Sequence, residues 1–512
     1  MRRSETSATG RTKFCSSGAG LWCAVAVTGS WLKYAFWIYL LFLVAADATV
    51  KNPADPDLWH RLALGEALWK TGQFPSGDTF SYLADYRDVA DHEWGSAVIF
   101  YGLYLAGGTS IFVATKVLTL GTTLVLTVRA GMLNRKPTAM LAAFYALILL
   151  ALLPSFQSTV RCMVFTHIFF ALWLYWFQGE RQGRGVWTGW YVVSMVVWAN
   201  LHGGFTIGLA WLFVLAALGV WQMRARCDAD PVYAPKKWAI RLGLCTLATL
   251  INPFGVQLWF STARALTTTR QGFAEWAPVS WWTGMFDYPG YKILLIVLVV
   301  GVAIRIGRTG WKRMDQPAVL FLALFAALSL SSARHTSLFA LVAGAFAPGL
   351  FPPRPKPDIF EDPIRRLGGM ALSAALLLTP LYSVLIFVPG EGLTLGYDSA
   401  SCPVAAVEFL QERKIEGKLL VTFNYGSYAL WELRGKMRVS MDGRYDLVYR
   451  PETYRRVDDF FFARGNWQSL LTSPAPDAIL VPMTAEVYPK LKGEAGWTEA
   501  WENGIDAVFL PR

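Results

Sequence analysis

Carboxylates and histidines gather in one polar stretch after the first apolar segment of this 512-residue chain. The stretch contains three short motifs: Asp55-Pro56-Asp57-Leu58-Trp59-His60, then Asp78-Thr79-Phe80-Ser81-Tyr82, then Asp91-His92-Glu93-Trp94. Charged groups beside a bilayer are costly, so those that occur there are usually functional. The pattern predicts a reaction centre at one face of a membrane, with Asp57 and Glu93 as the candidate catalytic carboxylates.

The composition is that of a membrane protein. The mean hydropathy is +0.35, 54% of the residues are hydrophobic and only 16% are charged. The net charge of +11 comes from short basic clusters between apolar runs, which is a topology signal and argues against a nucleic-acid-binding face. The six cysteines are scattered, without a Cys-x-x-Cys pair, so they indicate neither a metal site nor a disulfide framework.

Eleven apolar runs have about the length needed to cross a bilayer as a helix. They lie at 31–48, 110–130, 137–154, 163–178, 186–200, 204–222, 238–252, 291–306, 317–331, 335–350 and 367–388. A further run, 94–106, is short, and charge decides its assignment. If it lies in the membrane interface, every basic cluster between crossings falls on the cytoplasmic side, as the positive-inside rule requires.

This topology places segment 1–30 in the cytoplasm, a membrane domain at 31–390, and the polar loop 49–109 outside. Within that loop, Asp55 followed by Pro56 predicts a helix start, and Gly72 predicts its end. The helix between them and the run 94–106 are expected to lie on the membrane surface and to hold Asp57 and Glu93 near it.

From about residue 391 to 512 the composition becomes that of a soluble α/β domain, placed outside by the same topology. Strands are expected at 419–423, 438–441, 478–481 and 507–510, alternating with helices such as 404–414 and 452–462. The segment has no phosphate-binding glycine fingerprint, nucleophile elbow or zinc motif, so a second enzyme activity is not expected there.

Together these features resemble the GT-C superfamily of glycosyltransferases, enzymes that use polyprenyl-phosphate sugars. In those families a loop aspartate is followed about fifteen residues later by a glycine, as Asp57 is by Gly72. The ordered motifs of the first loop, with Asn200-Leu201-His202-Gly203-Gly204 and Asp442-Gly443-Arg444, look like a group of bacterial membrane proteins assigned to this superfamily. The Trp-Trp-Asp-Tyr-Gly signature of oligosaccharyltransferases is missing from the C-terminal segment.

The resemblance implies an inverting transfer of sugar from a polyprenyl-phosphate donor to a glycan, lipid or protein acceptor at the outer face of a bacterial inner membrane. Asp57 is then the expected general base, and Glu93 a second carboxylate that binds the acceptor or helps to hold a metal. Cations on the outer side are the expected phosphate ligands. The other candidate substrate-binding residues are Asp55, His60, His92, Arg161, His202, Arg334 and His335.

Simpler interpretations stay open. Asp55 is a natural helix cap, Arg161 and Arg334 could anchor helix ends, and Asp442-Gly443-Arg444 could be a turn or an acceptor site. Asp55, Asp57 and Glu93 together would suit Mg²⁺ or Mn²⁺, and the sequence leaves metal dependence undecided. A transporter or flippase of lipid-linked saccharide is the alternative function; it would be expected to carry ionisable groups at mid-membrane depth.

Overall fold

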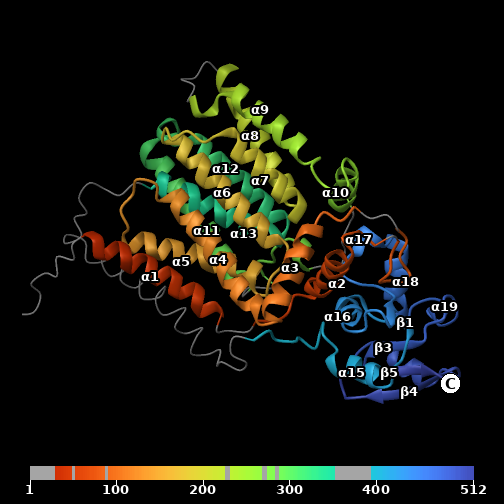
Figure 1. Cartoon of the computed structure of the whole chain (residues 1–512). Coiled ribbons are helices and arrows are strands. Elements are labelled where there is room, and N and C mark those ends of the chain that lie inside the picture. Colours follow the sequence, from red (N-terminus) through yellow and green to blue (C-terminus); the bar gives the residue numbers. More distant parts are fainter. Residues whose placement is uncertain are drawn as a thin grey trace, which may run out of the picture.

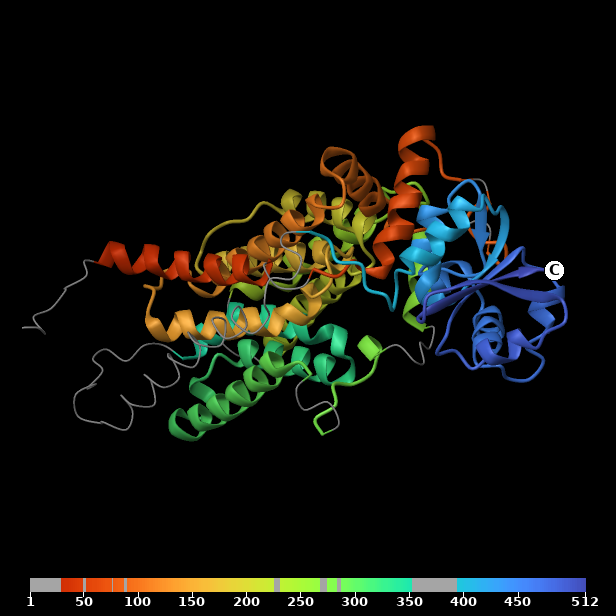
Figure 2. The same cartoon turned by 90° about the horizontal axis from the view of Figure 1, so that it is seen from below.

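The computed structural model describes residues 29–48, 52–75, 77–86, 90–224, 231–267, 274–282, 287–351 and 394–512. A helical bundle makes up the N-terminal two thirds of the chain, and the C-terminal α/β part packs against one end of it (Figures 1 and 2). The predicted crossing at 367–388 and nearly all of the N-terminal segment 1–30 lie outside the described residues.

The bundle helices coincide with the other ten predicted crossings. They are α1 (Gly29–Ala48), α4 (Ile111–Gly131), α5 (Ala139–Leu152), α6 (Met163–Arg181), α7 (Thr188–Leu201), α8 (Phe205–Arg224), α9 (Pro235–Ala248), α11 (Pro289–Thr309), α12 (Gln316–Ser331) and α13 (Thr336–Leu350). A further helix, α10 (Gln257–Thr267), follows α9, and short 3-10 helices join the others: η1 (Leu153–Phe156), η2 (Pro231–Tyr233), η3 (Ala274–Trp276), η4 (Trp311–Arg313) and η5 (Ala333–His335).

Within the described residues, α4, α8 and α11 are each long and apolar enough to span a bilayer. Four shorter apolar stretches accompany them: Tyr34–Asp47, Trp94–Gly107, Met140–Phe156 and Gln316–Ser331. At the centre of the bundle α13 is buried along almost its whole length. Its small residues allow close approach, since a Cβ at Gly131 of α4 would lie 2.1 Å from the Gly344 carbonyl oxygen.

The two ends of the bundle differ in chemistry. At one end, basic side chains join the loops: Arg184 Nη2 donates to Asn134 Oδ1 at 3.3 Å, and buried Arg241 forms two hydrogen bonds with Glu180 at 2.8 and 2.9 Å. The segment before α12 reaches this end too, through the ion pair of Arg181 with Asp315. The polar motifs lie at the opposite end, so the structure segregates the basic loops from the candidate site.

Helices α2 (Pro56–Thr71) and α3 (Trp94–Gly107) confirm the two helices expected in the first polar loop. Asp55 caps α2 by accepting from the Asp57 N–H at 3.0 Å, and Gly72 ends it at φ 65°. The two helices cross in close contact, because a Cβ at Gly65 would lie 2.2 Å from the Ala97 carbonyl oxygen. The first and last turns of α3 both lie at the motif-bearing end, where Trp94 bonds Asn200 and Tyr104 packs on Trp431.

The C-terminal part holds a five-stranded sheet with the order β2-β1-β3-β5-β4. Its strands are β1 (Gly417–Leu420), β2 (Met437–Val439), β3 (Ala478–Pro482), β4 (Trp497–Glu502) and β5 (Asp506–Pro511), and its helices are α15 (Val404–Glu412), α16 (Phe423–Glu432), α17 (Tyr445–Val448), α18 (Pro451–Phe461), α19 (Ser469–Thr472) and α20 (Tyr488–Lys492). Strands β2, β1 and β3 run parallel, and β5 and β4 pair antiparallel. The four expected strands are present. The sequence analysis missed β4, an edge strand whose glutamates and threonine mask the apolar alternation.

The first polar loop extends this sheet at its β2 edge. The Tyr82 N–H donates to the Val439 carbonyl at 3.1 Å, and the Val439 N–H donates to the Phe80 carbonyl at 3.0 Å. A second backbone connection joins Pro53 to Gly396. Sequence segments more than 300 residues apart therefore form one continuous structure around the site.

Candidate active site

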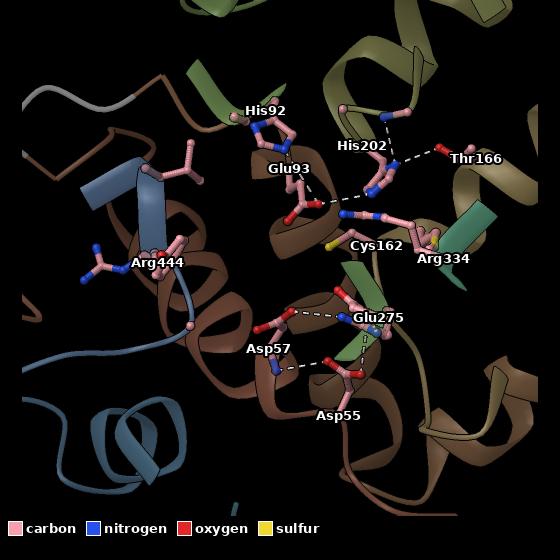
Figure 3. Close-up of a pocket in the computed structure, with 18 of the residues that line it drawn as sticks. Asp55, Asp57, His92, Glu93, Cys162, Thr166, His202, Glu275, Arg334 and Arg444 are labelled. Carbon is pink, nitrogen blue, oxygen red and sulfur yellow. Dashed lines mark hydrogen bonds and ion pairs between the residues drawn. The ribbon is translucent and has the colours of Figure 1, made fainter. Parts of the chain in front are cut away.

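A cavity of about 640 Å³ opens where α2, α3, the bundle loops and the C-terminal part meet. The chain has only five histidines, and all of them line it: His60, His92, His167, His202 and His335. Figure 3 shows two acidic groups facing this space, Asp55, Asp57 and Glu275 on one side and Glu93 with His92 and His202 on the other. The two catalytic and seven substrate-binding candidates from the sequence all lie on the cavity wall.

Arg161 is the centre of the first acidic group. Its Nε lies 3.0 Å from Asp55 Oδ2, its Nη2 3.5 Å from Asp57 Oδ2, and its Nη1 donates to Glu275 Oε2 at 2.8 Å. Ser158 adds a hydrogen bond to Asp55 Oδ2 at 2.7 Å. One guanidinium thus serves three carboxylates, so this group carries an excess of negative charge when all three are ionised.

Asp57 is the most accessible carboxylate of that group. Its side chain is 41% exposed in the cavity, whereas that of Asp55 is 3% exposed. Desolvation by the surrounding protein, followed by repulsion from Asp55, raises the pKa of Asp57 to about 7, and Arg161 only partly opposes the shift. A carboxylate with this pKa takes up a proton far more readily than an ordinary aspartate does.

Arg61 is the centre of the second acidic group. It pairs with Asp91 and, through Nη2, with Glu93 Oε2 at 2.7 Å, and its side chain is only 4% exposed. Burial by itself would raise the pKa of Glu93, but Arg61 together with the nearby histidines more than offsets burial and lowers the pKa well below the ordinary value. Glu93 is therefore a fixed anion and a weak base.

His202 holds the other oxygen of Glu93. Its Nδ1 accepts a hydrogen bond from the Gly204 N–H at 2.9 Å, so this nitrogen carries no proton and also accepts from the Thr166 hydroxyl at 2.7 Å. Thr166 Oγ1 in turn accepts from Trp198 Nε1. The proton of the neutral ring therefore sits on Nε2, which lies 3.4 Å from Glu93 Oε1. Burial lowers the pKa of His202 to about 3, in agreement with a neutral ring.

The His92-Glu93-Trp94 and Asn200–Gly204 motifs pack directly against each other. Trp94 Nε1 donates to Asn200 Oδ1 at 2.9 Å, which docks the start of α3 on the loop after α7. Both glycines of the second motif are sterically required. A Cβ at Gly203 would lie 2.7 Å from the His92 ring, and one at Gly204 would lie 2.1 Å from Thr166 Oγ1.

The C-terminal part forms the opposite wall. Arg444 pairs with Asp78 of the first loop at 2.7 Å and with Asp442 at 2.6 Å, so the Asp78 and Asp442 motifs are also partners. His60 Nδ1 lies 3.1 Å from Ser427 Oγ of α16, and burial lowers the pKa of His60 to about 3. His60 is therefore a neutral group that joins α2 to the C-terminal part.

Arg334 and His335 lie in η5, next to the α10 side of the cavity. The Arg334 guanidinium stacks on the Trp276 ring at 3.9 Å and points toward the Glu93 and His202 group in Figure 3. Apolar side chains also line the cavity, among them Ile207, Leu266 and Leu338. The cavity wall therefore includes a cation and apolar surface as well as carboxylates.

The carboxylates suggested as metal ligands from the sequence do not form one cluster in this arrangement. Asp55 and Asp57 face Arg161 while Glu93 faces Arg61, so the three carboxylates considered from the sequence belong to separate groups. No cluster of three His, Cys, Asp or Glu side chains disposed to hold a metal is found among the described residues. The positive charge at Asp55 and Asp57 comes from a guanidinium.

Two site residues escaped the sequence analysis. Arg61 directly follows His60 in the first motif. It was passed over because an arginine in an amphipathic helix is ordinarily expected on the solvent-exposed face. Glu275 lies in η3, far along the chain. The one sequence feature that could have indicated it is that Trp276 follows it, as Trp94 follows Glu93. Both residues are identified only by the contacts they make.

No protein-family model matches the chain, and no curated protein matches it. The fold is similar to that of arabinofuranosyltransferase AftD from Mycobacteria, with a TM-score of 0.53, 14% identity and 94% of this chain covered. A structure of an AftD mutant (R1389S, class 2) matches with a TM-score of 0.52 and 13% identity over 95% of this chain. ArnT from Cupriavidus metallidurans, bound to undecaprenyl phosphate, matches with a TM-score of 0.47 and 13% identity over 95% of this chain and 98% of its own. The chain spans 40–42% of the length of the AftD chains, and across that span its fold is similar to theirs.

Proposed function

We propose that this protein is a membrane glycosyltransferase that moves a sugar from a polyprenyl-phosphate donor to an acceptor hydroxyl, with inversion at the anomeric carbon. The observation that carries the proposal is Asp57, an accessible carboxylate with a pKa raised to about 7. The same cavity is lined by arginine side chains, among them Arg161 and Arg334. The AftD-like fold supports the same class of reaction.

The reaction follows from these positions. Asp57 takes the proton of the acceptor hydroxyl as its oxygen forms a bond to the anomeric carbon. The bond from that carbon to the phosphate oxygen breaks on the opposite face, and the electron pair leaves with the polyprenyl phosphate. Arg334, helped by His335, stabilises the charge that grows on the phosphate. Glu93, fixed by Arg61 and His202, offers an anionic hydrogen-bond acceptor to a sugar hydroxyl.

The orientation in the membrane is part of the proposal. Arg181, Arg184 and Arg241 lie at the end of the bundle away from the cavity, which the positive-inside rule assigns to the cytoplasm. Both ends of α3 lie at the cavity end, which supports a surface position for this helix. Reporter fusions near residues 133, 182 and 310 should read cytoplasmic, and fusions near 85 and 450 extracytoplasmic; an outside signal at 182 would contradict this topology.

A cavity at one end of the bundle favours transfer over transport, because transporter sites lie near mid-membrane depth. The test is transfer itself. Purified protein in liposomes should move label from one of a panel of radiolabelled polyprenyl-phosphate sugars to an acceptor in a cell-envelope extract, and Asp57→Asn should not. Equal label transfer by the wild type and by Asp57→Asn would remove the proposed mechanism.

A further inference from the structure

The turn at residues 442–444 reaches from the C-terminal part to the proposed base. Gly443 lies against the free side of Asp57, because a Cβ built on Gly443 would lie 2.5 Å from Asp57 Oδ1. The same Cβ would lie 2.9 Å from His60 Nδ1. Real Cβ atoms do not approach heavy atoms this closely, so a side chain at position 443 would displace Asp57, His60 or the turn itself.

Hydrogen bonds and packing hold Gly443 in this position. Its N–H donates to Ser427 Oγ at 2.9 Å, and the same hydroxyl lies 3.1 Å from His60 Nδ1. Beneath the turn, a Cβ at Gly426 would lie 1.7 Å from the Met441 carbonyl oxygen. The start of α16 is thus packed directly under residues 441–443 and has no room to shift toward them.

The turn is also fastened to the first polar loop. Asp442 is fully buried and accepts from the Tyr449 hydroxyl at 2.8 Å, and Arg444 links Asp442 to Asp78. The backbone pairing of Phe80 and Tyr82 with Val439 fixes the same loop to β2. Asp57 is therefore held from two directions, by Arg161 at Oδ2 and by the Gly443 turn beside Oδ1.

We infer that Gly443 is a positioning residue for the reaction: the C-terminal α/β domain holds Asp57 at the angle needed for proton transfer and walls the acceptor side of the cavity. This inference rests on the proposed function and deepens it. The turn contributes Arg444 and Tyr445 to the cavity wall, and α16 contributes Asn424, while Arg334 lies on the other side. Arg334, the proposed ligand of the donor phosphate, and the C-terminal wall thus lie on different sides of the cavity.

Gly443→Ala tests the inference, with Gly496→Ala as the matched control in the same domain. Gly496 is exposed, a Cβ there meets no atom within 4 Å, and its backbone is not in the left-handed region. Gly443→Ala should lower turnover by about 10²-fold, the typical cost of misplacing a catalytic group by about 1 Å. The apparent donor KM and the affinity for undecaprenyl phosphate should stay within about twofold of wild type, and so should the number of undecaprenyl phosphate sites per protein, which general unfolding would lower.

Ser427→Ala serves as a second variant that adds no bulk. It removes the acceptor of the Gly443 N–H and the partner of His60, so turnover should fall by about tenfold, equivalent to about 1.4 kcal/mol, again without a change in donor KM. Wild-type turnover in both variants would overturn the inference.

Hydrogen–deuterium exchange, which needs no substrate, separates this inference from the proposed function. Backbone amides at 57–61 should exchange faster in Gly443→Ala than in wild type, and those of Gly496→Ala should not. If the wild type transfers no sugar while this exchange pattern holds, the proposed function fails and the contact between domains stands. Unchanged exchange in Gly443→Ala would overturn the positioning role even in an active enzyme.

Discussion

Two guanidinium groups organise the carboxylates of this cavity, and they do so with opposite effects. Arg61 is almost fully buried, pairs with Asp91 and Glu93, and lowers the pKa of Glu93. Arg161 is 31% exposed and is shared among Asp55, Asp57 and Glu275. Its charge therefore does not overcome burial and the repulsion between neighbouring carboxylates, and the pKa of Asp57 stays raised.

The ratio of charges explains the difference. When one guanidinium is divided among three carboxylates, the last of them gains by taking up a proton, which makes it a base. A carboxylate that is held at 2.7 Å by a buried guanidinium gains nothing from protonation. From the sequence, Asp57 was the expected base and Glu93 a second carboxylate for acceptor or metal; the pKa values of the two groups are shifted in opposite directions.

The largest expected effect comes from Asp57→Asn. Asparagine keeps the size of the side chain but takes up no proton, so the rate of transfer should fall by about 10²–10⁴-fold. Initial rates of label transfer by equal amounts of folded protein would measure it. Asp55→Asn is the matched control and should keep most activity, because asparagine also caps helices. Similar losses in both variants would break the distinction between cap and base.

Arg334→Ala should come next, with a loss of about 10²-fold, since it removes a charged hydrogen-bond donor from the departing phosphate. Arg334→Lys keeps the charge without the planar fork and should retain partial activity. Kinetics at varied donor concentration should place the loss mainly in turnover. Unchanged kinetics in both variants would reduce Arg334 to a helix-end anchor and leave the phosphate to other groups.

Glu93→Gln should cost about tenfold, or about 1.4 kcal/mol of transition-state stabilisation, far less than Asp57→Asn. Glutamine keeps a hydrogen bond to Arg61 but loses the charge-assisted part of it. Comparing the two variants in one assay sharpens the contrast between the two acidic groups. A loss in Glu93→Gln as large as that in Asp57→Asn would restore Glu93 as a candidate base.

The smallest effects concern pH. Since Asp57 must be deprotonated to act, the rate should rise with pH through about 7. Asp55 raises the pKa of Asp57, so Asp55→Asn should move this limb to lower pH; Arg161 lowers it, so Arg161→Gln should move the limb to higher pH. Rate profiles between about pH 5 and 9 would show both shifts. Movement of the two limbs in the same direction would contradict the assignment of the base.

Interactions between residues close together in the chain made many of the helices predictable. Asp55, Pro56 and Gly72 defined the ends of α2, because capping needs only neighbouring residues. Apolar run length located ten helices of the bundle within a few residues. The edge strand β4 was missed because its polar side chains hide the period of two, and Glu275 was missed because nothing near it in the chain predicts that it meets Arg161.

By itself, the sequence determined the membrane class, the helices and the set of candidate site residues, all of which depend on residue type and short-range pattern. Only the tertiary structure decided how those residues are paired: Glu93 with Arg61, Asp57 with Arg161, and Gly443 beside Asp57. The physical reason is that a pKa depends on burial and on charges within a few ångströms, and these neighbours come from distant parts of the chain. The proposal of Asp57 as the base thus depends on contacts that only the fold creates.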